Sequence, residues 1–550
     1  MIIKRIVVFC ALMGVAMSPI HTKIANSSLV KKTSFKKSVA PAITKSTAAS
    51  IKNTQQVILP WPDVLDEVKD AVVQIFSYSS PFNFQTPFKR DALTRSSGSG
   101  FFVMLDGVLS IITNYHVIDK ADIIYLQHPN AWKECIELEF VGGSPEFDIA
   151  LLRFKPGQQA LLEQKLGDSV IKTLELGNSD KVRQGEEIML IGYPLGEEHV
   201  KHAVGTISGH ESIHCGECFT TTAAAFPGNS GGACVSQAGQ VIGILVAGIA
   251  SSQGLNYVLP ISREKVVLKE LENGRVLERP FWGLVGQSTT PETFEYFNVP
   301  GDGGLLVTKV EPDSLFSKAG LQKNDVITAI MAFDERMPVD RFGYVAVPWS
   351  SYKMEFFDVL GRIYYGNTFE LEYWRDGQLQ TLQVTKTFDN PFQVKRKSLP
   401  FDQEPAYEIF AGCVVMEFTM NHYLQVLPRL KSYLNACSPD LTVFTKLAIA
   451  DGRKEPKLLI SHVFPESGLA KNHVFEGPLN ILEKVNGQQV RTIADYRDAM
   501  QKSLETGYIV FEGADGITVV LKMADVIQQE LTLAEKYNYQ PSGMFLKMVM

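Results

Sequence analysis

Residues 226–232 read Phe226-Pro227-Gly228-Asn229-Ser230-Gly231-Gly232, and this stretch is the most informative in the chain. A serine set among glycines after a proline is what a sharply turned loop with exposed backbone amides requires. Such a loop can present the Ser230 hydroxyl as a nucleophile. It also aims the amide N–H groups of Gly228 and Ser230 at one point, where the oxyanion of a tetrahedral intermediate would develop. Taken alone, the stretch leaves an ordinary glycine turn as the alternative.

A serine hydroxyl is a poor nucleophile unless a base takes its proton and a third group orients that base. His116 ends an apolar strand, and Asp148 stands at the head of another, Ile149–Phe154. A lone histidine is more often structural, and a lone aspartate before a strand is usually a turn or cap residue. The order His116, Asp148, Ser230 on one β-rich segment instead predicts nucleophilic catalysis. This is the chymotrypsin-like chain order, not that of α/β-hydrolases or subtilisins.

Short apolar runs separated by glycine-containing turns surround these residues. Short strands at this spacing, with few helical stretches, predict a closed all-β domain. The clearest are Gly100–Met104, Leu109–Asn114, Ile149–Phe154, Glu187–Gly192, Gln240–Gly248 and Asn256–Leu259. Residues Ile261–Asn273 then predict a helix, with Ser262 as its N-cap and Gly274 just past its end.

The combination resembles the Deg/HtrA-type serine proteases, in which a trypsin-like domain is followed by PDZ domains. The shared stretches lie within residues 63–275 and are Gly98–Phe101, Thr113–Val117, Asp148–Leu152, Ile191–Gly196, Gly205–Ser208 and Pro227–Gly232. The resemblance implies a mainly β protein that begins with a chymotrypsin-like double β-barrel. It also implies that His116 is the general base, Asp148 its orienting acid and Ser230 the nucleophile. Gly228 and Ser230 would form the oxyanion hole.

Residues 280–390 extend the resemblance to a PDZ domain. Phe281-Trp282-Gly283-Leu284 is similar to the aromatic–x–Gly–aliphatic loop that receives a peptide's C-terminal carboxylate in the PDZ domains of this family. These four residues are therefore the candidate peptide-binding residues. Such a site adds the ligand as an extra strand and caps its carboxylate with backbone amides.

A weaker match occupies residues 402–525. Phe410–Val415 repeats the aromatic–x–Gly–aliphatic opening, Asn486-Gly487 is a hairpin signal, and a helix is expected to start at Ser467. The segment resembles the degenerate second PDZ-like domain of plant-type Deg proteases, which tends to serve oligomer assembly. Both PDZ-like domains are expected to be α+β, and residues 526–550 are expected to form a helical tail.

Ala224 lies six residues before Ser230. The resemblance places this position at the base of the primary specificity pocket. A small apolar residue there, with the aliphatic Ile244–Ala247 nearby, favours medium aliphatic side chains over charged ones.

Cys215 and Cys218 form a Cys-x-x-Cys stretch with His210 and His214 close by in the sequence. Such a group can bind Zn²⁺ or cycle as a disulfide. No second cysteine pair stands at zinc-finger spacing, so neither a metal site nor a cofactor is predicted. The favoured interpretation is an irregular surface loop with inert thiols, and a local disulfide is the next alternative.

The composition bounds the class of protein. Of 550 residues, 45% are hydrophobic and 21% charged, which is ordinary for globular protein and excludes a disordered chain. The longest apolar run, Ile6–Met17, is too short to span a bilayer, so no integral membrane span is expected in the mature chain. Nine basic and no acidic residues precede Asp63, which leaves the rest of the chain acidic. An acidic body argues against nucleic-acid binding.

The N-terminus has the pattern of a signal peptide. Lys4 and Arg5 precede the apolar run, and small residues follow it, so residues 1–18 are interpreted as an export signal and residues 19–62 as a basic flexible linker. An exported protein of the periplasm or cell envelope is expected. An organellar transit peptide for a chloroplast or mitochondrion is the alternative, because this region is basic and rich in hydroxyl groups.

Together these features favour a serine endopeptidase acting on unfolded or damaged proteins. Nothing in the sequence resembles a P-loop, which fits ATP-independent proteolysis. The expected partners are unfolded polypeptides and peptide C-termini, and the resemblance implies a homo-oligomer built from trimers. The rival function is a PDZ scaffold or chaperone-like binder of unfolded chains with little proteolysis.

Overall fold

The computed structural model describes residues 59–131, 134–246, 256–274, 276–388, 404–426, 455–475 and 480–549. The predicted signal peptide and most of the predicted basic linker therefore lie outside the described residues. Within the described part of the chain, no helix has the length and apolar character needed to cross a membrane.

Six antiparallel strands close the first barrel in the order β1-β2-β3-β6-β5-β4. They are β1 (Val72–Ser79), β2 (Thr94–Leu105), β3 (Val108–Thr113), β4 (Ile123–Gln127), β5 (Ile136–Ser144) and β6 (Ile149–Phe154). Closure removes exposed strand edges, and it buries the apolar residues of each strand. The helices of this part are α2 (Trp61–Val68), η1 (Lys69–Ala71), α3 (Tyr115–Ile118) and α4 (Gln158–Leu166).

A second barrel follows, closed in the order β10-β11-β12-β9-β8-β7. Its strands are β7 (Glu187–Gly192), β8 (Lys201–Ile213), β9 (Gly216–Thr221), β10 (Ala233–Val235), β11 (Val241–Val246) and β12 (Asn256–Pro260), with the short helices η2 (Ser179–Lys181) and η3 (Pro194–Gly196). The two barrels confirm the predicted chymotrypsin-like architecture. Their side chains share one continuous hydrophobic cluster, to which Val103, Ile112, Met189 and Val241 belong.

The predicted helix after the second barrel is present as α5 (Ile261–Leu271), but its predicted N-cap is wrong. The cap position is Pro260, and Ser262 lies inside the first turn. The Ser262 hydroxyl donates to Asn178 Oδ1 at 3.1 Å and accepts from the Ser179 amide at 3.0 Å. A tertiary contact with η2 therefore replaces the local capping bond that the sequence pattern suggested.

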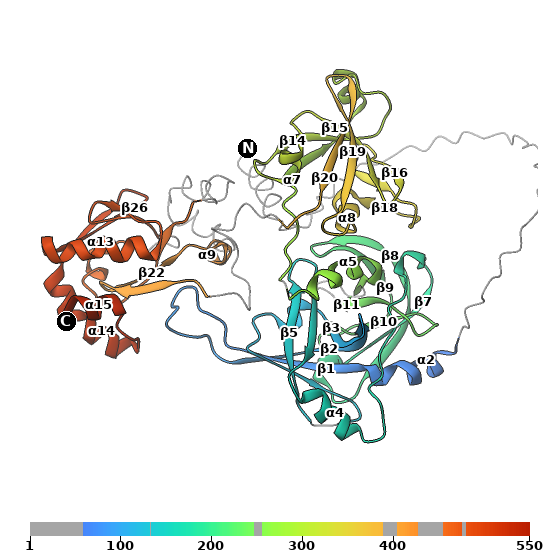
Figure 1. The fold of residues 1–550 in the computed structure, drawn as a ribbon, viewed down its shortest axis with the longest axis horizontal. Helices are drawn as coiled ribbons and strands as arrows, with labels where there is room; N and C mark the ends of the chain where they lie inside the picture. The colour runs from blue at the N-terminus through green and yellow to red at the C-terminus, as the bar shows by residue number, and fades with distance from the viewer. Residues whose placement is uncertain are drawn as a thin grey trace, which may run out of the picture.

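The third sheet has the strand order β13-β14-β15-β19-β20, with β16 paired to β15. Its strands are β13 (Leu284–Ser288), β14 (Leu305–Val310), β15 (Val326–Ala332), β16 (Glu335–Pro338), β19 (Thr368–Arg375) and β20 (Gln378–Thr385). A two-stranded ribbon, β17 (Tyr344–Ala346) and β18 (Lys353–Glu355), and the helices α6 (Pro291–Tyr296), α7 (Leu315–Ala319) and α8 (Phe356–Gly361) complete this α+β unit. Figure 1 shows it next to β8 and β9 of the second barrel.

The last sheet has the order β21-β22-β23-β24-β26-β27, with β25 paired to β24. Its strands are β21 (Tyr407–Phe410), β22 (Cys413–Glu417), β23 (Leu458–Val463), β24 (Asn480–Val485), β25 (Gln488–Gln489), β26 (Tyr508–Gly513) and β27 (Thr518–Lys522). The helices are α9 (Met420–Val426), η6 (Ala470–Asn472), α13 (Ile493–Thr506), α14 (Met523–Tyr537) and α15 (Gly543–Val549). Val526, Met544 and Phe545 of the last two helices pack into the core of this sheet.

Two local predictions in this sheet have different outcomes. Asn486 and Gly487 both have positive φ, +51° and +77°, and join β24 to β25 in the tight hairpin that their sequence predicted. No α-helix starts at Ser467, however. The Ser467 hydroxyl accepts from the Ala470 amide at 3.0 Å, and only the single-turn helix η6 follows. His473, with φ +51° in the left-handed region, ends η6 after this one turn.

The last sheet also contacts the first barrel. The β1–β2 connection carries Phe88, whose ring lies 5.5 Å from that of Phe464 and 5.8 Å from that of Tyr539. Arg90 in the same connection forms an ion pair with Glu404. This long connection, drawn in blue in Figure 1, thus reaches from the protease-like barrels to the C-terminal sheet.

Candidate active site

The sequence-predicted histidine and aspartate meet at the edge of the first barrel. His116 lies in α3, directly after β3, and Asp148 precedes β6, which pairs with β3. The His116 ring Nδ1 is 2.8 Å from Asp148 Oδ2 and 3.0 Å from Oδ1. The backbone amide of His116 also donates to Asp148 Oδ1, at 2.9 Å. One carboxylate therefore fixes both the backbone and the ring of the histidine.

The electrostatics of this pair suit a general base. Burial lowers the pKa of His116, but its hydrogen bond to Asp148, the charge of Asp148 and that of Asp119 more than offset this effect, so the pKa is raised. A neutral His116 that keeps its proton on Nδ1, facing the carboxylate, leaves Nε2 with the lone pair that a base needs. The side chain of His116 remains 49% exposed, whereas that of Asp148 is 7% exposed.

Asp148 itself occupies an unfavourable backbone conformation. Its φ is +56°, in the left-handed region that residues other than glycine rarely adopt. Such strain costs about 1–3 kcal/mol and persists only where the surroundings enforce it. One enforcing contact comes from Asn114, whose side-chain amide donates to the Asp148 carbonyl at 2.8 Å. Asn114 is fully buried. The sequence pattern included it only as part of the Thr113–Val117 stretch around His116 and predicted no role for it.

Ser230 lies in the loop between β9 and β10, and the first barrel holds this loop from behind. The Ser99 amide donates to the Ser230 carbonyl at 2.8 Å, and the Ser99 hydroxyl donates to the Gly228 carbonyl at 2.7 Å. The Gly231 amide donates to Leu245 of β11 at 2.9 Å. Ser99 belongs to the Gly98–Phe101 stretch of the sequence resemblance. Its two hydrogen bonds to the Ser230 loop give it a structural role that the sequence pattern did not reveal.

Two glycines make this close approach feasible. Gly231 has φ +84°, and a Cβ there would lie 2.2 Å from the Ser99 carbonyl oxygen. Gly228 has φ +98°, and a Cβ there would lie 2.5 Å from the Tyr193 carbonyl oxygen. A larger residue at Gly231 would push the loop away from the first barrel, and one at Gly228 would push it away from the segment that follows β7 in the second barrel. The structure therefore supports the prediction of a sharply turned loop, whereas the oxyanion-binding role of Gly228 and Ser230 stays a prediction.

Ala224, the predicted specificity residue, is exposed in a cavity of about 320 Å³ next to the Ser230 loop. Its other lining residues are apolar, Leu190, Pro194, Leu195, Ala203 and Phe226, or polar, Glu197, Lys201, His202 and Asn229. Ile244–Val246, which the sequence placed nearby, do not line this cavity, and Ala247 lies outside the described residues.

The four candidate peptide-binding residues form a turn that leads into β13. The Gly283 carbonyl accepts from the Glu311 amide at 2.7 Å, and the Phe281 carbonyl accepts from the Leu315 amide at 3.1 Å. Trp282 stacks on Phe316 at 5.4 Å, so its ring packs against the domain core. Among the strands that the structure describes, β13 pairs only with β14, so its other edge is the outer edge of this sheet.

The Cys215–Cys218 stretch is not a surface loop, and that part of the prediction is wrong. Cys215 lies at the β8–β9 turn, Cys218 lies in β9, and both are fully buried free thiols. Burial raises the pKa of Cys215 to about 12 and raises that of Cys218 well above the ordinary value. A thiol with a raised pKa forms little of the reactive thiolate, and the inertness of these two thiols stays a prediction. Among the described residues, no group of His, Cys, Asp and Glu is arranged to hold a metal ion.

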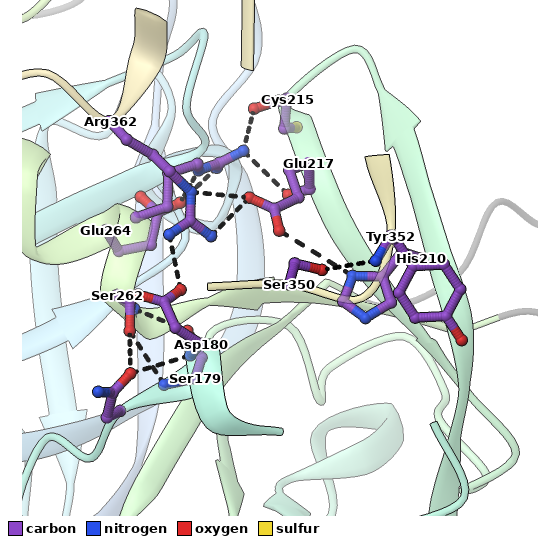
Figure 2. A network of polar contacts seen from close by, with 12 residues as sticks. Ser179, Asp180, His210, Cys215, Glu217, Ser262, Glu264, Ser350, Tyr352 and Arg362 are labelled. Carbon is purple, nitrogen blue, oxygen red and sulfur yellow. Dashed lines mark hydrogen bonds and ion pairs between the residues drawn. The ribbon is translucent and has the colours of Figure 1, made fainter. Parts of the chain in front are cut away.

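A buried polar network joins the second barrel to the third sheet (Figure 2), and no motif in the sequence predicted it. Arg362, at the end of α8, contacts Glu217 at 2.8 Å and Asp180 at 2.6 Å. The His210 ring lies 4.4 Å from that of Tyr352. Burial and the nearby Arg362 lower the pKa of His210, although Glu217 partly opposes this. These groups lie far apart in sequence, so only the folded chain brings them together.

Two family models match this chain. A trypsin-like peptidase domain matches residues 98–244, and a PDZ domain matches residues 397–541. The first range contains all three residues of the predicted triad, and the second contains the last sheet.

Curated proteins are similar to part of this chain. A probable periplasmic serine endoprotease DegP-like of Marinomonas sp. is 28% identical over 316 residues, which are 56% of this chain and 61% of that protein. A second from Pseudomonas savastanoi pv. phaseolicola is 30% identical, over 54% of this chain and 57% of that protein. The putative serine protease HhoB of Synechocystis is 29% identical, over 45% of this chain and 60% of that protein. The chain thus spans about 60% of the length of these relatives.

Among solved structures, the HtrA-type protease AlgW with decapeptide is 24% identical, with a TM-score of 0.45, over 60% of this chain and all of that chain. The serine endoprotease from Yersinia pestis is 23% identical, with a TM-score of 0.41, over 61% of this chain and all of that chain.

Proposed function

We propose that this chain, a relative of the HtrA/Deg-type trypsin-like serine proteases with a PDZ domain, is an ATP-independent serine endopeptidase that cleaves unfolded or damaged proteins. The observation that carries the proposal is the contact of 2.8 Å between His116 Nδ1 and Asp148 Oδ2, in the same pair of closed barrels that holds Ser230 in a glycine loop.

Catalysis would proceed in two half-reactions. His116 Nε2 takes the proton of the Ser230 hydroxyl as its oxygen attacks the scissile carbonyl, and the Gly228 and Ser230 amides stabilise the oxyanion. The resulting imidazolium is stabilised by Asp148 and gives its proton to the leaving amine, which departs as the acyl-enzyme forms. Water then attacks the ester with His116 again as base, and this step releases the acid and restores Ser230.

The cavity beside Ala224 would select the substrate side chain. Its apolar wall, formed by residues such as Leu190 and Phe226, favours an aliphatic group of medium size. Unfolded proteins expose such groups, whereas folded proteins bury them. This difference would direct the enzyme to misfolded chains without an energy-consuming unfolding step.

The third sheet would bind a peptide C-terminus along β13. An open edge strand can accept an antiparallel peptide strand, and the turn at Phe281–Leu284 would hold the terminal carboxylate. The C-terminal sheet would instead serve assembly into a homo-oligomer built from trimers. We further propose a periplasmic or envelope location, in line with relatives named as periplasmic, with an organelle as the alternative.

A casein-cleavage assay combined with a fluorophosphonate probe tests this function against that of a binding scaffold. A protease digests unfolded casein, and the probe labels one serine, Ser230, in proportion to the activity lost. Binding of casein without cleavage and without labelling would favour the scaffold.

A further inference from the structure

The segment that connects the second barrel to the third sheet, residues 276–280, lies against the turn that carries Asp148. Val276 forms an isolated parallel bridge with Gly143. The Leu277 amide donates to the Gly143 carbonyl at 2.8 Å, and the Ser144 hydroxyl donates to the Leu277 carbonyl at 2.6 Å. The connecting segment therefore pairs with the end of β5, next to the turn that carries Asp148.

Arg279 in the connecting segment contacts Glu146 and Phe147, the two residues that precede Asp148. Its backbone amide donates to the Glu146 carboxylate. Its guanidinium donates to the Glu146 carbonyl at 3.1 Å and to the His214 carbonyl at 3.1 Å, and it lies 5.1 Å from the centre of the Phe147 ring. One side chain thus contacts both residues that precede Asp148 in the chain and ties them to the β8–β9 turn of the other barrel.

A second guanidinium, that of Arg263 in α5, lies 5.6 Å from the same Phe147 ring. Arg263 is 2% exposed, and it donates to the Cys215 carbonyl at 2.8 Å and the Glu217 carbonyl at 3.0 Å. It also forms an ion pair with Glu264. Figure 2 shows Cys215, Glu217 and Glu264 together beside Arg362 of the third sheet. A cation over an aromatic ring is a specific attraction, so two of them restrict where Phe147 can lie.

These contacts meet at a residue whose backbone needs support. Asp148 holds φ +56°, which persists only when neighbours over-determine it. Phe147, the residue before it, is 4% exposed and packs in the hydrophobic cluster that the two barrels share. If the turn relaxed, the carboxylate would leave His116, and displacement of a catalytic group by 1 Å can cost about 10²-fold in rate.

We propose that Arg279 is a positioning residue for the triad: through Glu146 and Phe147 it holds the strained turn so that the Asp148 carboxylate meets His116. The proposal rests on the proposed protease function. It gives the connecting segment a direct effect on the active site. The Tyr365 hydroxyl of the third sheet donates to the Glu278 carbonyl at 3.2 Å and fixes the same segment from its other side.

The charged groups around His116 and Asp148 determine how a variant can shift the pKa of His116. His116 faces Asp148 and Asp119. Asp148 in turn lies near Glu264 of α5 and the Cys215 thiol of the β8–β9 turn, both of which it affects electrostatically. Arg263 and Arg279 are the cations near these groups. A mispositioned Asp148 removes the main contribution that raises the pKa of His116, whereas burial, which lowers it, remains.

The test compares Arg279→Ala and Arg279→Lys with Arg183→Ala in the full chain. Arg183 is the matched control because its side chain is 83% exposed and pairs only with Glu186 among the salt bridges of the described residues. We expect Arg279→Ala to lower kcat by about 10–100-fold with KM within about twofold, since the turn and not the substrate contact is affected. Arg279→Lys keeps the positive charge but loses the planar group that donates to two carbonyls at once. Its kcat should therefore lie between that of the wild type and that of Arg279→Ala. Arg183→Ala should match the wild type.

A second readout separates this proposal from the protease function. NMR titration of the His116 imidazole, in a Ser230→Ala background, needs no turnover. Arg279→Ala should lower the pKa of His116 relative to Arg183→Ala. If the chain lacks protease activity but the pKa falls, the positioning role stands and the function fails. An unchanged kcat and an unchanged His116 titration in Arg279→Ala would overturn the proposal. Should Arg279→Ala not fold, Phe147→Leu removes the ring under both guanidiniums and must give the same shift.

Discussion

Arg362 and Glu217 form a buried ion pair between the third sheet and the second barrel, with an Nη2–Oε2 distance of 2.8 Å and both side chains 8% exposed. A second carboxylate, that of Asp180, lies 2.6 Å from the same guanidinium. Guanidinium groups suit such buried pairing because they donate in a planar fork. The contact holds the third sheet beside the β8–β9 hairpin, whose turn also receives the guanidinium of Arg279.

Removing this arginine should weaken the interface strongly. Arg362→Ala leaves the buried Glu217 without its guanidinium partner, with His210 at 4.0 Å beside it, a change that costs about 3–5 kcal/mol. The matched control is Arg336→Ala in the same sheet, whose side chain is 54% exposed and pairs with Glu372, and which should cost about 1 kcal/mol or less. Denaturant unfolding of both variants measures the difference. Equal losses would show that the buried pair contributes no more than a surface one.

The His116–Asp148 pair predicts a pH dependence. A base must be neutral to accept a proton, so activity should fall as the pH drops through the raised pKa of His116. Asp148→Asn removes the interaction that raises this pKa, so the acidic limb of the kcat/KM profile should move to lower pH. The same variant should lower kcat by about 10⁴-fold, because the wrong tautomer of His116 is held. An acidic limb that stays in place would contradict the assignment of Asp148.

Peptide binding at β13 predicts sensitivity to the terminal carboxylate. A peptide with an apolar last residue should bind more tightly than its C-terminal amide by about 1.5–3 kcal/mol, the value of hydrogen bonds to a charged group. Isothermal titration of both peptides against the Ser230→Ala chain measures this without cleavage. Equal affinities would remove the Phe281–Leu284 turn as a carboxylate site.

The C-terminal sheet should determine the subunit count. Truncation after Pro400 removes all of its strands and should leave a folded protease of fewer subunits, because a stable interface needs only about 800 Å² per partner. Phe88 loses Phe464 and Tyr539 in this variant, so the same truncation with Phe88→Ser controls for a newly exposed ring. Sedimentation velocity gives the count. An unchanged count in both truncated chains would refute the assembly role.

The sequence predicted the double barrel because its signals are local. Strands such as Ile149–Phe154 and Glu187–Gly192 are short apolar runs bounded by turns, and the structure has them with the same bounds. The Asn486-Gly487 hairpin is equally local, since each residue supplies its own positive φ. The prediction of Ser262 as the N-cap was wrong because its hydroxyl forms hydrogen bonds at η2 instead. This partner lies far away in the sequence and comes close only in the folded chain.

The rest of the site depends on long-range contacts that carry no sequence pattern. Ser99 in the first barrel contacts the Ser230 loop of the second, and Arg279 in the connecting segment contacts the turn that carries Asp148. The sequence predicted a surface loop at Cys215 and Cys218, yet both side chains are fully buried in the hydrophobic cluster that the two barrels share. Residue type and spacing indicate the chemistry of the triad, whereas the supports of the triad appear only in three dimensions.

The central claim is that Ser230, activated by His116 and Asp148, cleaves peptide bonds. Turnover of unfolded casein by the full chain and by Ser230→Ala, with Ser236→Ala as a control from the next turn, tests it most directly. We expect kcat to fall by about 10⁴–10⁶-fold in Ser230→Ala but not in Ser236→Ala. Substrate binding and oxyanion stabilisation retain only a small fraction of the rate. Digestion by Ser230→Ala at a rate near that of the wild type would contradict the account.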